Sequence, residues 1–508
     1  MLFIFTDCGL IIGGAILLQI YYSINQNIFI KNSFKVLKSR TVWLYNEKNI
    51  LRDEYGMKQN SMLTGDPIKS IVRFSLPIMA SSLLQYNYTL VDNILVGRYV
   101  STDALAAVGG VGSINSFIVG AALGLTSGFT IPVAQAFGAK DQNKINRFTG
   151  SSITVSFLLG ILLVVIAHII STPLLKLIGT PDEILGLSSS YVNILYFAIP
   201  FQMLSNNFTA ISRAVGESKK PLYYFIVSIF VNFVLDMLFI VGFHWSVEGA
   251  ALATLISHIV AAALTGNYIL RHNKSVKVSK ENLKFDTKTA LIQLKLGIPV
   301  SLQFTVTSIG SMILQSAVNS FGTATIAGFT AAGRVENLAN IPLSGLSVGT
   351  QTFVGQNYGA KNYDRITKSV KKIFVLDILL SVVLSVAMLV VGMPIVKLFM
   401  AEPNEEILFA AKKYLLATAE CFSLVAVLFV LRNTLQGLGF TYANAVAGAG
   451  ELIGRISIAL IFTPLIGFNA VCYAAPAAWL LADIPLAIIY LKKQKKFKAL
   501  ALKEQQKE

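Results

Sequence analysis

Four oxygen-bearing side chains in the first half of the chain lie inside long apolar segments, where polar groups are rare. Asp92 occupies one segment, Asn232 and Asp236 share a second, and Thr254 lies in a third. Asn232 precedes Asp236 by four residues, so both side chains project from one face of a helix. Because an ionisable residue within a membrane is energetically costly, each aspartate is a candidate functional residue.

The positions of these residues along their segments place them at one depth. Asp92 and Asp236 lie shortly before their segments end, and Thr254 lies as far into the next one. At 1.5 Å per residue, each is about 8–9 Å from the same membrane surface. Two carboxylates, an amide and a hydroxyl at one depth form a hard oxygen site. We predict a coupling-cation site for H⁺ or Na⁺; the alternative is that Asn232 and Asp236 only form hydrogen bonds with neighbouring helices.

Other reactive residues do not suggest enzyme chemistry. Cys8, Cys421 and Cys472 have no CxxC spacing, and the histidines form no HExxH pair. The run GGVG at 109–112 lacks the Lys-Ser/Thr of a phosphate loop. We therefore predict that the chain is not an enzyme, holds no cofactor or metal and uses no ATP, so that an ion gradient drives any transport.

The composition is typical of an integral membrane protein. Of 508 residues, 54% are apolar and 13% are charged, whereas soluble domains usually carry about 25% charged residues. Apolar segments long enough to cross a bilayer recur along the chain. We therefore expect an all-α polytopic membrane protein with twelve spans, near 71–97, 105–135, 149–170, 184–206, 221–242, 248–270, 290–319, 325–355, 370–396, 407–431, 441–463 and 468–491.

Lysine and arginine residues gather on one side of the predicted membrane. They are frequent at 138–148, 213–220, 271–295 and 359–372 and after Leu491, and rare in the alternate connections. By the positive-inside rule, the start of the core and the C-terminus are cytoplasmic. The same residues account for the net charge of +16, so we expect the lipid bilayer, and not nucleic acid, as a partner.

The sequence repeats itself in its second half. VAQAFGAKD at 133–141 returns as VGQNYGAKN at 354–362, and Pro77 and Pro299 occupy similar places in their segments. Six spans in each repeat give both the same orientation, so two six-helix lobes are related by a pseudo-two-fold axis along the membrane normal. Secondary transporters with this arrangement work by rocking of the lobes. We take Pro77 and Pro299 as hinge candidates.

The repeat defines the expected domain boundaries. They are an N-terminal extension at 1–56, an N-lobe at 57–270, a basic cytoplasmic linker at 271–289, a C-lobe at 290–491 and a basic cytoplasmic tail at 492–508. Residues 1–56 do not fit the repeat. We interpret them as an extra helix or as a mis-assigned start that precedes Met57, in preference to a targeting segment.

The second half of the chain carries different charges. The repeat places Arg455 and Ala459 where the first half has its amide and aspartate, so the oxygen site belongs to the first half alone. The charged residues within its segments are Arg334, Glu336, Glu420, Glu451 and Arg455. A structural ion-pair network is favoured, since Glu451 and Arg455 are four residues apart. Glu420 has no nearby partner in the sequence and is a candidate for binding a cationic substrate, while Asp483 is expected at the membrane interface.

Several segments resemble the multidrug and toxic compound extrusion (MATE) family, in particular its MepA-like and DinF-like bacterial members. They are LTGDPIKSIVRFSLPIMASSLLQ (63–85), VDNILVG (91–97), NFVLDMLFIVG with VEGAALAT (232–254), GQNYGAKN (355–362) and RNTLQGLG (432–439). The resemblance covers about residues 62–492. It implies a twelve-helix exporter that exchanges protons or sodium for organic cations and other amphipathic drugs.

The resemblance also implies roles for single residues. In one branch of the family the ion site consists of residue types that Asp92, Asn232, Asp236 and Thr254 match. Another branch has an acid near the position of Thr307, which argues against a C-lobe cation site here. We expect a monomer in the cytoplasmic (inner) membrane of a bacterium. Rival functions are a lipid-linked glycan flippase of the same wider superfamily, which needs a basic cavity, and a non-transporting membrane receptor.

Overall fold

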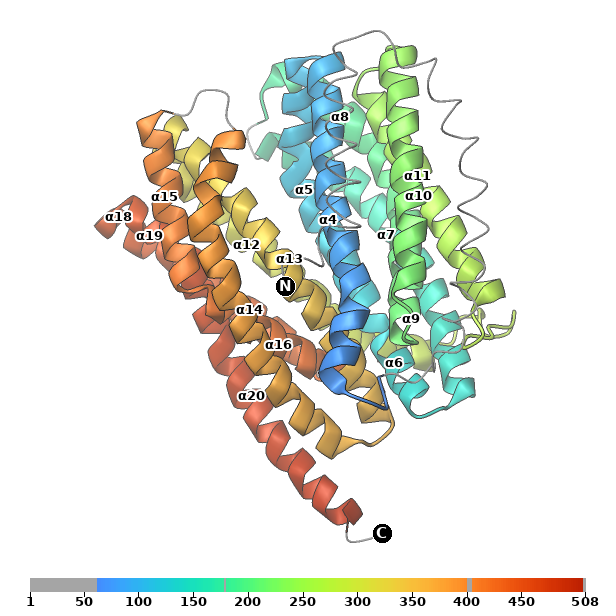
Figure 1. Ribbon diagram of the computed structural model, residues 1–508. Helices are drawn as coiled ribbons and strands as arrows, with labels where there is room; N and C mark the ends of the chain where they lie inside the picture. The colour runs from blue at the N-terminus through green and yellow to red at the C-terminus, as the bar shows by residue number, and fades with distance from the viewer. Residues whose placement is uncertain (1–61, 178–179, 400–403, 506–508) are drawn as a thin grey trace, which may run out of the picture. The chain divides into compact units, whose positions relative to one another are not determined.

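The apolar segments of the sequence fold as helices that lie side by side (Figure 1). The computed structural model describes residues 62–177, 180–399 and 404–505, and no β-strand occurs among them. The expected extension at 1–56 lies outside the described residues. The N-lobe consists of α4 (Pro67–Tyr99), α5 (Thr102–Phe129), α6 (Ile131–Gly138), α7 (Gln142–Leu177), α8 (Asp182–Leu195), the 3₁₀ turn η1 (Tyr196–Ala198), α9 (Ile199–Ala214), α10 (Lys219–Asp236), the π-helical turn η2 (Met237–Gly242), α11 (Val247–Asn267) and the π-helical turn η3 (Tyr268–His272).

The C-lobe repeats this order of helices. It consists of α12 (Thr287–Asn319), α13 (Thr323–Gly359), α14 (Tyr363–Leu398), α15 (Glu405–Glu420), α16 (Phe422–Gly437), α17 (Tyr442–Ser457), the π-helical turn η4 (Ile458–Phe462), α18 (Thr463–Ile466), α19 (Phe468–Cys472) and α20 (Ala474–Gln505). In both lobes the fourth span is broken. η1 interrupts it between α8 and α9, and a bend of 51° separates α15 from α16.

The helices make six spans in each lobe, which confirms the predicted fold class. Among the described residues, nine helical segments are long and apolar enough to cross a membrane, and the bent pair α15–α16 makes a tenth. The first span of the N-lobe, α4, has 33 residues, and the second span of the C-lobe, α13, has 37. These two helices pack on each other between the lobes. Because they face protein more than lipid, their sequences are less apolar than those of the outer spans.

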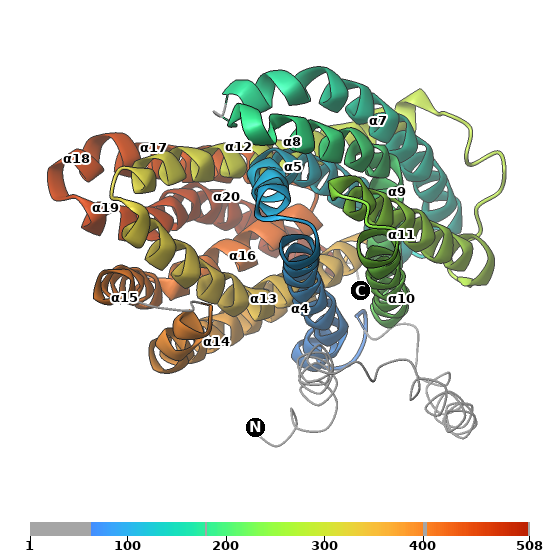
Figure 2. The same cartoon turned by 90° about the horizontal axis from the view of Figure 1, so that it is seen from above.

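The two lobes cross where α5 packs along α12 (Figure 2). A Cβ atom built on Gly124 would lie 2.4 Å from the Cα atom of Ser301, and one built on Gly128 would lie 2.4 Å from that of Gly297. In a lipid bilayer the hydrophobic effect does not drive helices together. Close van der Waals contact through small residues stabilises their association instead. The lobes therefore touch backbone to backbone at this crossing.

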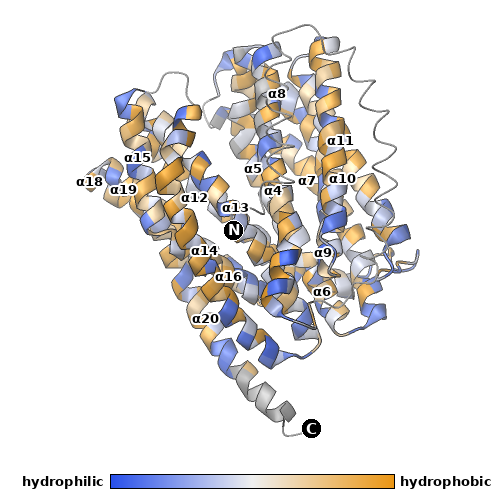
Figure 3. Cartoon of the chain, viewed as in Figure 1, coloured by the Kyte–Doolittle hydropathy of each residue, from blue (hydrophilic) through white to orange (hydrophobic). Residues whose placement is uncertain are grey.

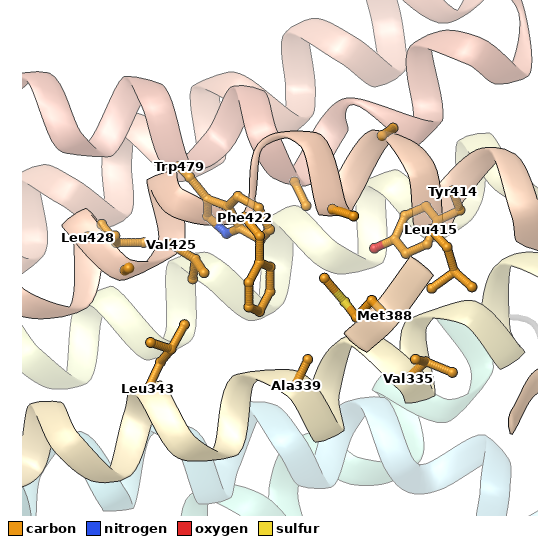
Figure 4. Packing of buried hydrophobic residues seen from close by; sticks show 14 of the residues in the cluster. Val335, Ala339, Leu343, Met388, Tyr414, Leu415, Phe422, Val425, Leu428 and Trp479 are labelled. Atoms are coloured by element: carbon orange, nitrogen blue, oxygen red, sulfur yellow. The ribbon is translucent and has the colours of Figure 1, made fainter. Parts of the chain in front are cut away.

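Each lobe also has a buried core of its own. The N-lobe core includes Tyr196 and Met203. In the C-lobe core, Phe422 and Trp479 point toward each other from α16 and α20 (Figure 4), with ring centroids 6.3 Å apart and an edge-to-face geometry. That arrangement is the favoured one for aromatic pairs. A further buried cluster joins the lobes, since Ile71, Phe74 and Ile78 of α4 belong to one core with Leu346 and Phe353 of α13.

The outer helices consist largely of apolar residues (Figure 3), and many of their large apolar side chains are exposed. On α14, one such stripe consists of Val375, Leu379, Val382, Val386 and Val390. Their spacing of three or four residues keeps them on one side of the helix. In water this surface would promote aggregation, so the stripe is the face that contacts lipid.

The connection between the lobes is fixed to the N-lobe. Asp286, which caps α12, accepts hydrogen bonds from the Thr289 hydroxyl and from Nη2 of Arg147 on α7, both at 2.5 Å. These bonds, that of Thr289 foremost, lower the pKa of Asp286 to about 2. We call the surface of the core at this connection the linker face, and the surface at the other ends of the spans the opposite face.

Candidate cation site and the cavity beside it

Three of the four predicted oxygen ligands meet where α10 packs against α11. The Asn232 amide satisfies both neighbours in the orientation in which its nitrogen donates to Oδ2 of Asp236 at 2.7 Å and its oxygen accepts from the backbone N–H of Thr254 at 3.3 Å. The exposed fractions of Asn232, Asp236 and Thr254 are 2%, 1% and 9%. The first contact follows from helix geometry, since residues four apart share a face. The second follows from the antiparallel pairing of the two helices.

The first span, α4, contributes from the other side. Asp92 interacts electrostatically with Asp236, and the hydroxyl of Tyr88, one turn before Asp92, lies 3.5 Å from Oγ1 of Thr254. Both acids also act on the buried Tyr191 of α8. The structure thus places all four predicted residues in one neighbourhood. Tyr88 and Tyr191 also lie in this neighbourhood and were not predicted from the sequence. The sequence did contain an indication for Tyr88, which precedes the intramembrane Asp92 by four residues.

Each aspartate keeps one buried oxygen without a hydrogen-bond partner. These atoms are Oδ1 of Asp92 and Oδ1 of Asp236. An unsatisfied buried polar atom is unfavourable, and two carboxylates in a medium of low dielectric constant repel each other. A proton or a small cation held between them would relieve both penalties. The arrangement is suited to reversible cation binding.

The helix that carries Asp236 widens directly after it into the π-helical turn η2. Such turns often mark functional sites. In the C-lobe, however, α17 passes into η4 at the equivalent place. The turn is therefore a property of the repeated scaffold, and the acids are an addition of the N-lobe.

A cavity of about 280 Å³ lies on the linker side of the candidate site. Gln85, Ser228 and His258 line it, and each lies three or four residues from Tyr88, Asn232 or Thr254 on its own helix. Helices of the N-lobe form most of the wall. The C-lobe completes it with Val348, Gln351, Thr352, Gly355 and Gly437. Hydroxyls, amides and apolar side chains alternate around the cavity, as is usual for a ligand site.

The lobes close the linker end of this cavity through two matched contacts, which we call the linker seal. Nε2 of Gln135 on α6 donates to the carbonyl oxygen of Gly437 at 3.1 Å, and Nε2 of Gln356 on α13 donates to that of Ala214 at 2.8 Å. Gln135 and Gln356 occupy equivalent positions in the two repeats. Each glutamine reaches the last residue of a helix in the other lobe.

Two glycines allow the backbones of the linker seal to touch. A Cβ atom on Gly138 would lie 1.8 Å from the carbonyl oxygen of Gln356, and one on Gly359 would lie 1.8 Å from that of Gln135. These distances leave no room for a side chain while the lobes are closed. The glycines of the repeated FGAK/YGAK motif are therefore explained by this contact.

The C-lobe charges form a network around Glu451. Its Oε1 accepts from Arg432 of α16, and its Oε2 accepts from the Thr307 hydroxyl at 3.1 Å. Nη1 of Arg455 lies 3.7 Å from the same Oε2 and donates to the Thr307 carbonyl at 3.1 Å. The expectation that Asp483 is interfacial is wrong: it is buried and interacts electrostatically with Arg432 and Glu451, because α20 packs along α17.

The remaining predicted C-lobe residues lie away from the cavity wall. Glu336 accepts a hydrogen bond from the Tyr414 hydroxyl at 2.5 Å, and the Arg334 guanidinium stacks over Phe399 at 5.3 Å. Glu420 is exposed at the bend between α15 and α16 and accepts from the Tyr473 hydroxyl at 3.1 Å. Glu420 therefore has a partner that is distant in the sequence, because Tyr473 lies in the turn between α19 and α20.

The two hinge candidates lie inside helices that face the other lobe. Pro77 is within α4, where the Ser81 hydroxyl donates to its carbonyl at 2.9 Å. Pro299 is within α12, between Gly297 and Ser301, which make the close contact with α5. Both therefore interrupt the backbone hydrogen bonding of spans at the boundary between the lobes.

Two charged residues within the helices, one buried and one half-buried, were not predicted to be functional. Asp377 of α14 is fully buried, and neither of its carboxylate oxygens has a hydrogen-bond partner. Arg213 of α9 lines the cavity. In the sequence, Asp377 resembles Asp92, because each is a single acidic residue in an apolar segment. Arg213 lies near a helix end, where arginine ordinarily reflects topology.

The repeated lobes correspond to a known family unit. The MatE family model matches the chain twice, at residues 77–238 and 299–461. The chain belongs to the MatE family. Its members are transporters and not enzymes, and each match covers most of one lobe of this MatE chain.

Individual relatives agree with this assignment. "Probable multidrug resistance protein YoeA" of Bacillus subtilis is 29% identical over 378 residues, which are 73% of this chain and 81% of that protein. "Multidrug export protein MepA" of Staphylococcus haemolyticus is 25% identical over 409 residues, 80% of this chain and 89% of that protein. A solved structure described as the "outward-facing conformation of a multidrug resistance MATE family transporter" has a TM-score of 0.81 at 23% identity, covering 87% of this chain and 99% of its own. It establishes the fold.

Proposed function

We propose that this chain is a secondary active multidrug efflux transporter that exchanges protons or sodium ions for organic cations and other amphipathic drugs. The observation that carries the proposal is the pair of aspartates, each with a buried unsatisfied oxygen, about two helical turns from the cavity-lining residues Gln85 and Ser228. The names of the curated relatives support multidrug export as the activity.

Coupling follows from the helices that the two sites share. The candidate cation site and the cavity wall both draw side chains from α4, α10 and α11, as Tyr88 and Gln85 illustrate on α4. A cation that neutralises Asp92 and Asp236 changes the packing of those helices and thereby the cavity. By linkage, the drug then changes the affinity for the cation by the same factor.

Alternating access requires the linker seal to open and close. The lysines and arginines near the linker face make it the cytoplasmic face, so both the core N-terminus and the C-terminus are cytoplasmic, in the inner membrane of a bacterium. With the seal closed, a drug in the cavity cannot leave toward the cytoplasm. Rocking of the lobes breaks the contacts of Gln135 and Gln356 and admits the next drug. The cavity is built by one chain, and the transporter acts as a monomer.

A lipid-linked glycan flippase is less well supported. Such a protein needs several cationic side chains to hold a pyrophosphate. Among the described residues that line this cavity, Arg213 is the one Lys or Arg. Drug efflux fits this wall better.

Everted membrane vesicles test the function directly. We expect ethidium uptake into vesicles that contain the transporter when a pH gradient or a sodium gradient is imposed, and its collapse when that one gradient is dissipated. Vesicles without the transporter give the background. Uptake that requires ATP and persists without either gradient would refute the proposal.

A further inference from the structure

The cavity is basic at one end, although the candidate cation site beyond its other end is acidic. Arg213 lines the cavity near the linker face, and no Asp or Glu occurs among the described lining residues. No carboxylate in the described part of the chain pairs with its guanidinium, and its Nε is buried without a hydrogen-bond partner. Arg213 as a whole is half-buried, and withdrawing a cation from water without a partner is unfavourable. The unpaired guanidinium is therefore suited to pair with an anion from outside the chain.

The helix that carries Arg213 offers a row of further polar groups. Gln202, Asn206, Thr209 and Arg213 all line the cavity, and their spacing of four, three and four residues places them on one face of α9. On the other walls, Leu123 of α5 and Phe225 of α10 are apolar. The cavity thus has a polar stripe that ends in a cation, facing apolar surface.

We propose that the cavity binds amphipathic molecules that carry an anionic group, a carboxylate, sulfonate or phosphate, paired with Arg213. This inference rests on the proposed function and adds, for the same cavity, one defined class to its amphipathic substrates. Guanidinium binds such groups through charge-assisted hydrogen bonds, while the apolar body packs against Phe225 and Leu123. Drug and coupling cation then occupy neighbouring sites of opposite charge and do not compete for the same carboxylates.

A matched pair of ligands isolates the charge. The full chain is placed in phosphatidylcholine nanodiscs, and binding of dansylglycine and of its uncharged amide is followed by fluorescence anisotropy, with empty nanodiscs subtracted. Loss of a hydrogen bond to a charged group weakens binding by roughly 10- to 100-fold. We expect the wild type to prefer dansylglycine over its amide by about this factor, and Arg213→Gln to lose the preference while still binding the amide.

Three further variants separate charge from folding. Arg213→Lys keeps the cation and retains most of the preference, and Arg98→Gln, at an exposed arginine of α4, leaves it unchanged. Thr209→Glu places a carboxylate one turn before Arg213, where it pairs with the guanidinium. It should abolish the preference even if Arg213→Gln fails to fold. Retention of the preference in Thr209→Glu or in a folded Arg213→Gln would overturn the inference.

The lipid composition identifies the source of the anion. If the natural occupant is a lipid headgroup, phosphatidylglycerol in the nanodisc weakens the apparent affinity for dansylglycine. If it is a free amphiphile, the affinity stays the same. Both results support pairing of an anion with Arg213. A wild type that shows no preference for dansylglycine yet exports ethidium on an ion gradient overturns this inference and leaves the proposed function intact. A wild type that prefers dansylglycine but does not export ethidium on either ion gradient refutes the proposed function alone.

Discussion

Equivalent helices of the two lobes carry opposite chemistry. On α10, Asn232 and Asp236 face Asp92, and both acids have an oxygen without a partner. On α17, the equivalent helix, Glu451 is held between two guanidiniums and a hydroxyl. The backbone is the same in both places, down to the π-helical turn that follows.

The difference teaches which lobe can respond to an ion gradient. A carboxylate that two arginines neutralise permanently gains nothing from a proton or a sodium ion. A carboxylate with an unsatisfied oxygen and a neighbouring acid gains from either. The duplicated scaffold therefore supplies the movement, and the unequal side chains assign cation binding to the N-lobe.

The largest expected effect is the loss of transport when the N-lobe acid is neutralised. Asp236→Asn keeps the size of the side chain but cannot bind a proton or a cation by charge, so we expect ethidium export to fall to the level of cells without the transporter. Export is measured in a host that lacks other pumps, and insertion is checked by membrane fractionation. Asp182→Asn, at an exposed acid of α8, is the matched control. Normal export by the Asp236→Asn variant would remove the N-lobe from the coupling mechanism.

The second prediction concerns the C-lobe, where the same kind of change should affect stability first. Glu451→Gln leaves Arg432 and Arg455 buried without their main partner, and breaking a buried ion pair costs about 3–5 kcal/mol. Replacing Arg432, Glu451 and Arg455 together by Met, Leu and Met should restore most of that stability. Unfolding in detergent micelles, followed by tryptophan fluorescence, measures both. If Glu451→Gln instead stops ion coupling at unchanged stability, the C-lobe charges form a second coupling site.

A third prediction uses the one place where the lobes are chemically alike. Gly138→Ala and Gly359→Ala each insert a methyl group into the linker seal, so both should open the linker face, and by similar amounts. In a variant without native cysteines that carries Thr352→Cys in the cavity wall, we expect faster labelling by an impermeant maleimide applied to the linker face. Gly333→Ala, where an added Cβ meets nothing within 4 Å, is the control. Unequal effects of the two glycines would show that the seal is not symmetric in function.

The helical fold was predictable because hydropathy and charge are summed over many residues. Even α4 and α13, whose partly polar sequences reflect contact between the lobes, were recognisable from their length and from the repeat. The rise per residue of a helix was enough to place Asp92 and Asp236 at one depth. That common depth followed from regular geometry alone.

Contacts between helices that are distant in the chain were not predictable. Arg432 reaches Glu451 from the preceding span, and Tyr473, the partner of Glu420, lies between α19 and α20. Neither follows from spacing along one helix, because the rotation of each helix against its neighbour is fixed by packing. For the same reason Asp483 seemed interfacial although it is buried.

The smallest expected effect tests how far the N-lobe site extends beyond its acids. The Tyr88 hydroxyl contacts Thr254 at 3.5 Å, which is long for a hydrogen bond, so its removal should cost about 0.5 kcal/mol, or roughly twofold in cation affinity. Tyr88→Phe should therefore export ethidium at near-normal rates but need a gradient about twice as steep for half-maximal activity. The gradient dependence in vesicles measures this, with Tyr99→Phe at the exposed end of α4 as the control. A loss as complete as that of Asp236→Asn would mean that the hydroxyl itself binds the cation, and the site would then have five oxygen-bearing residues instead of four.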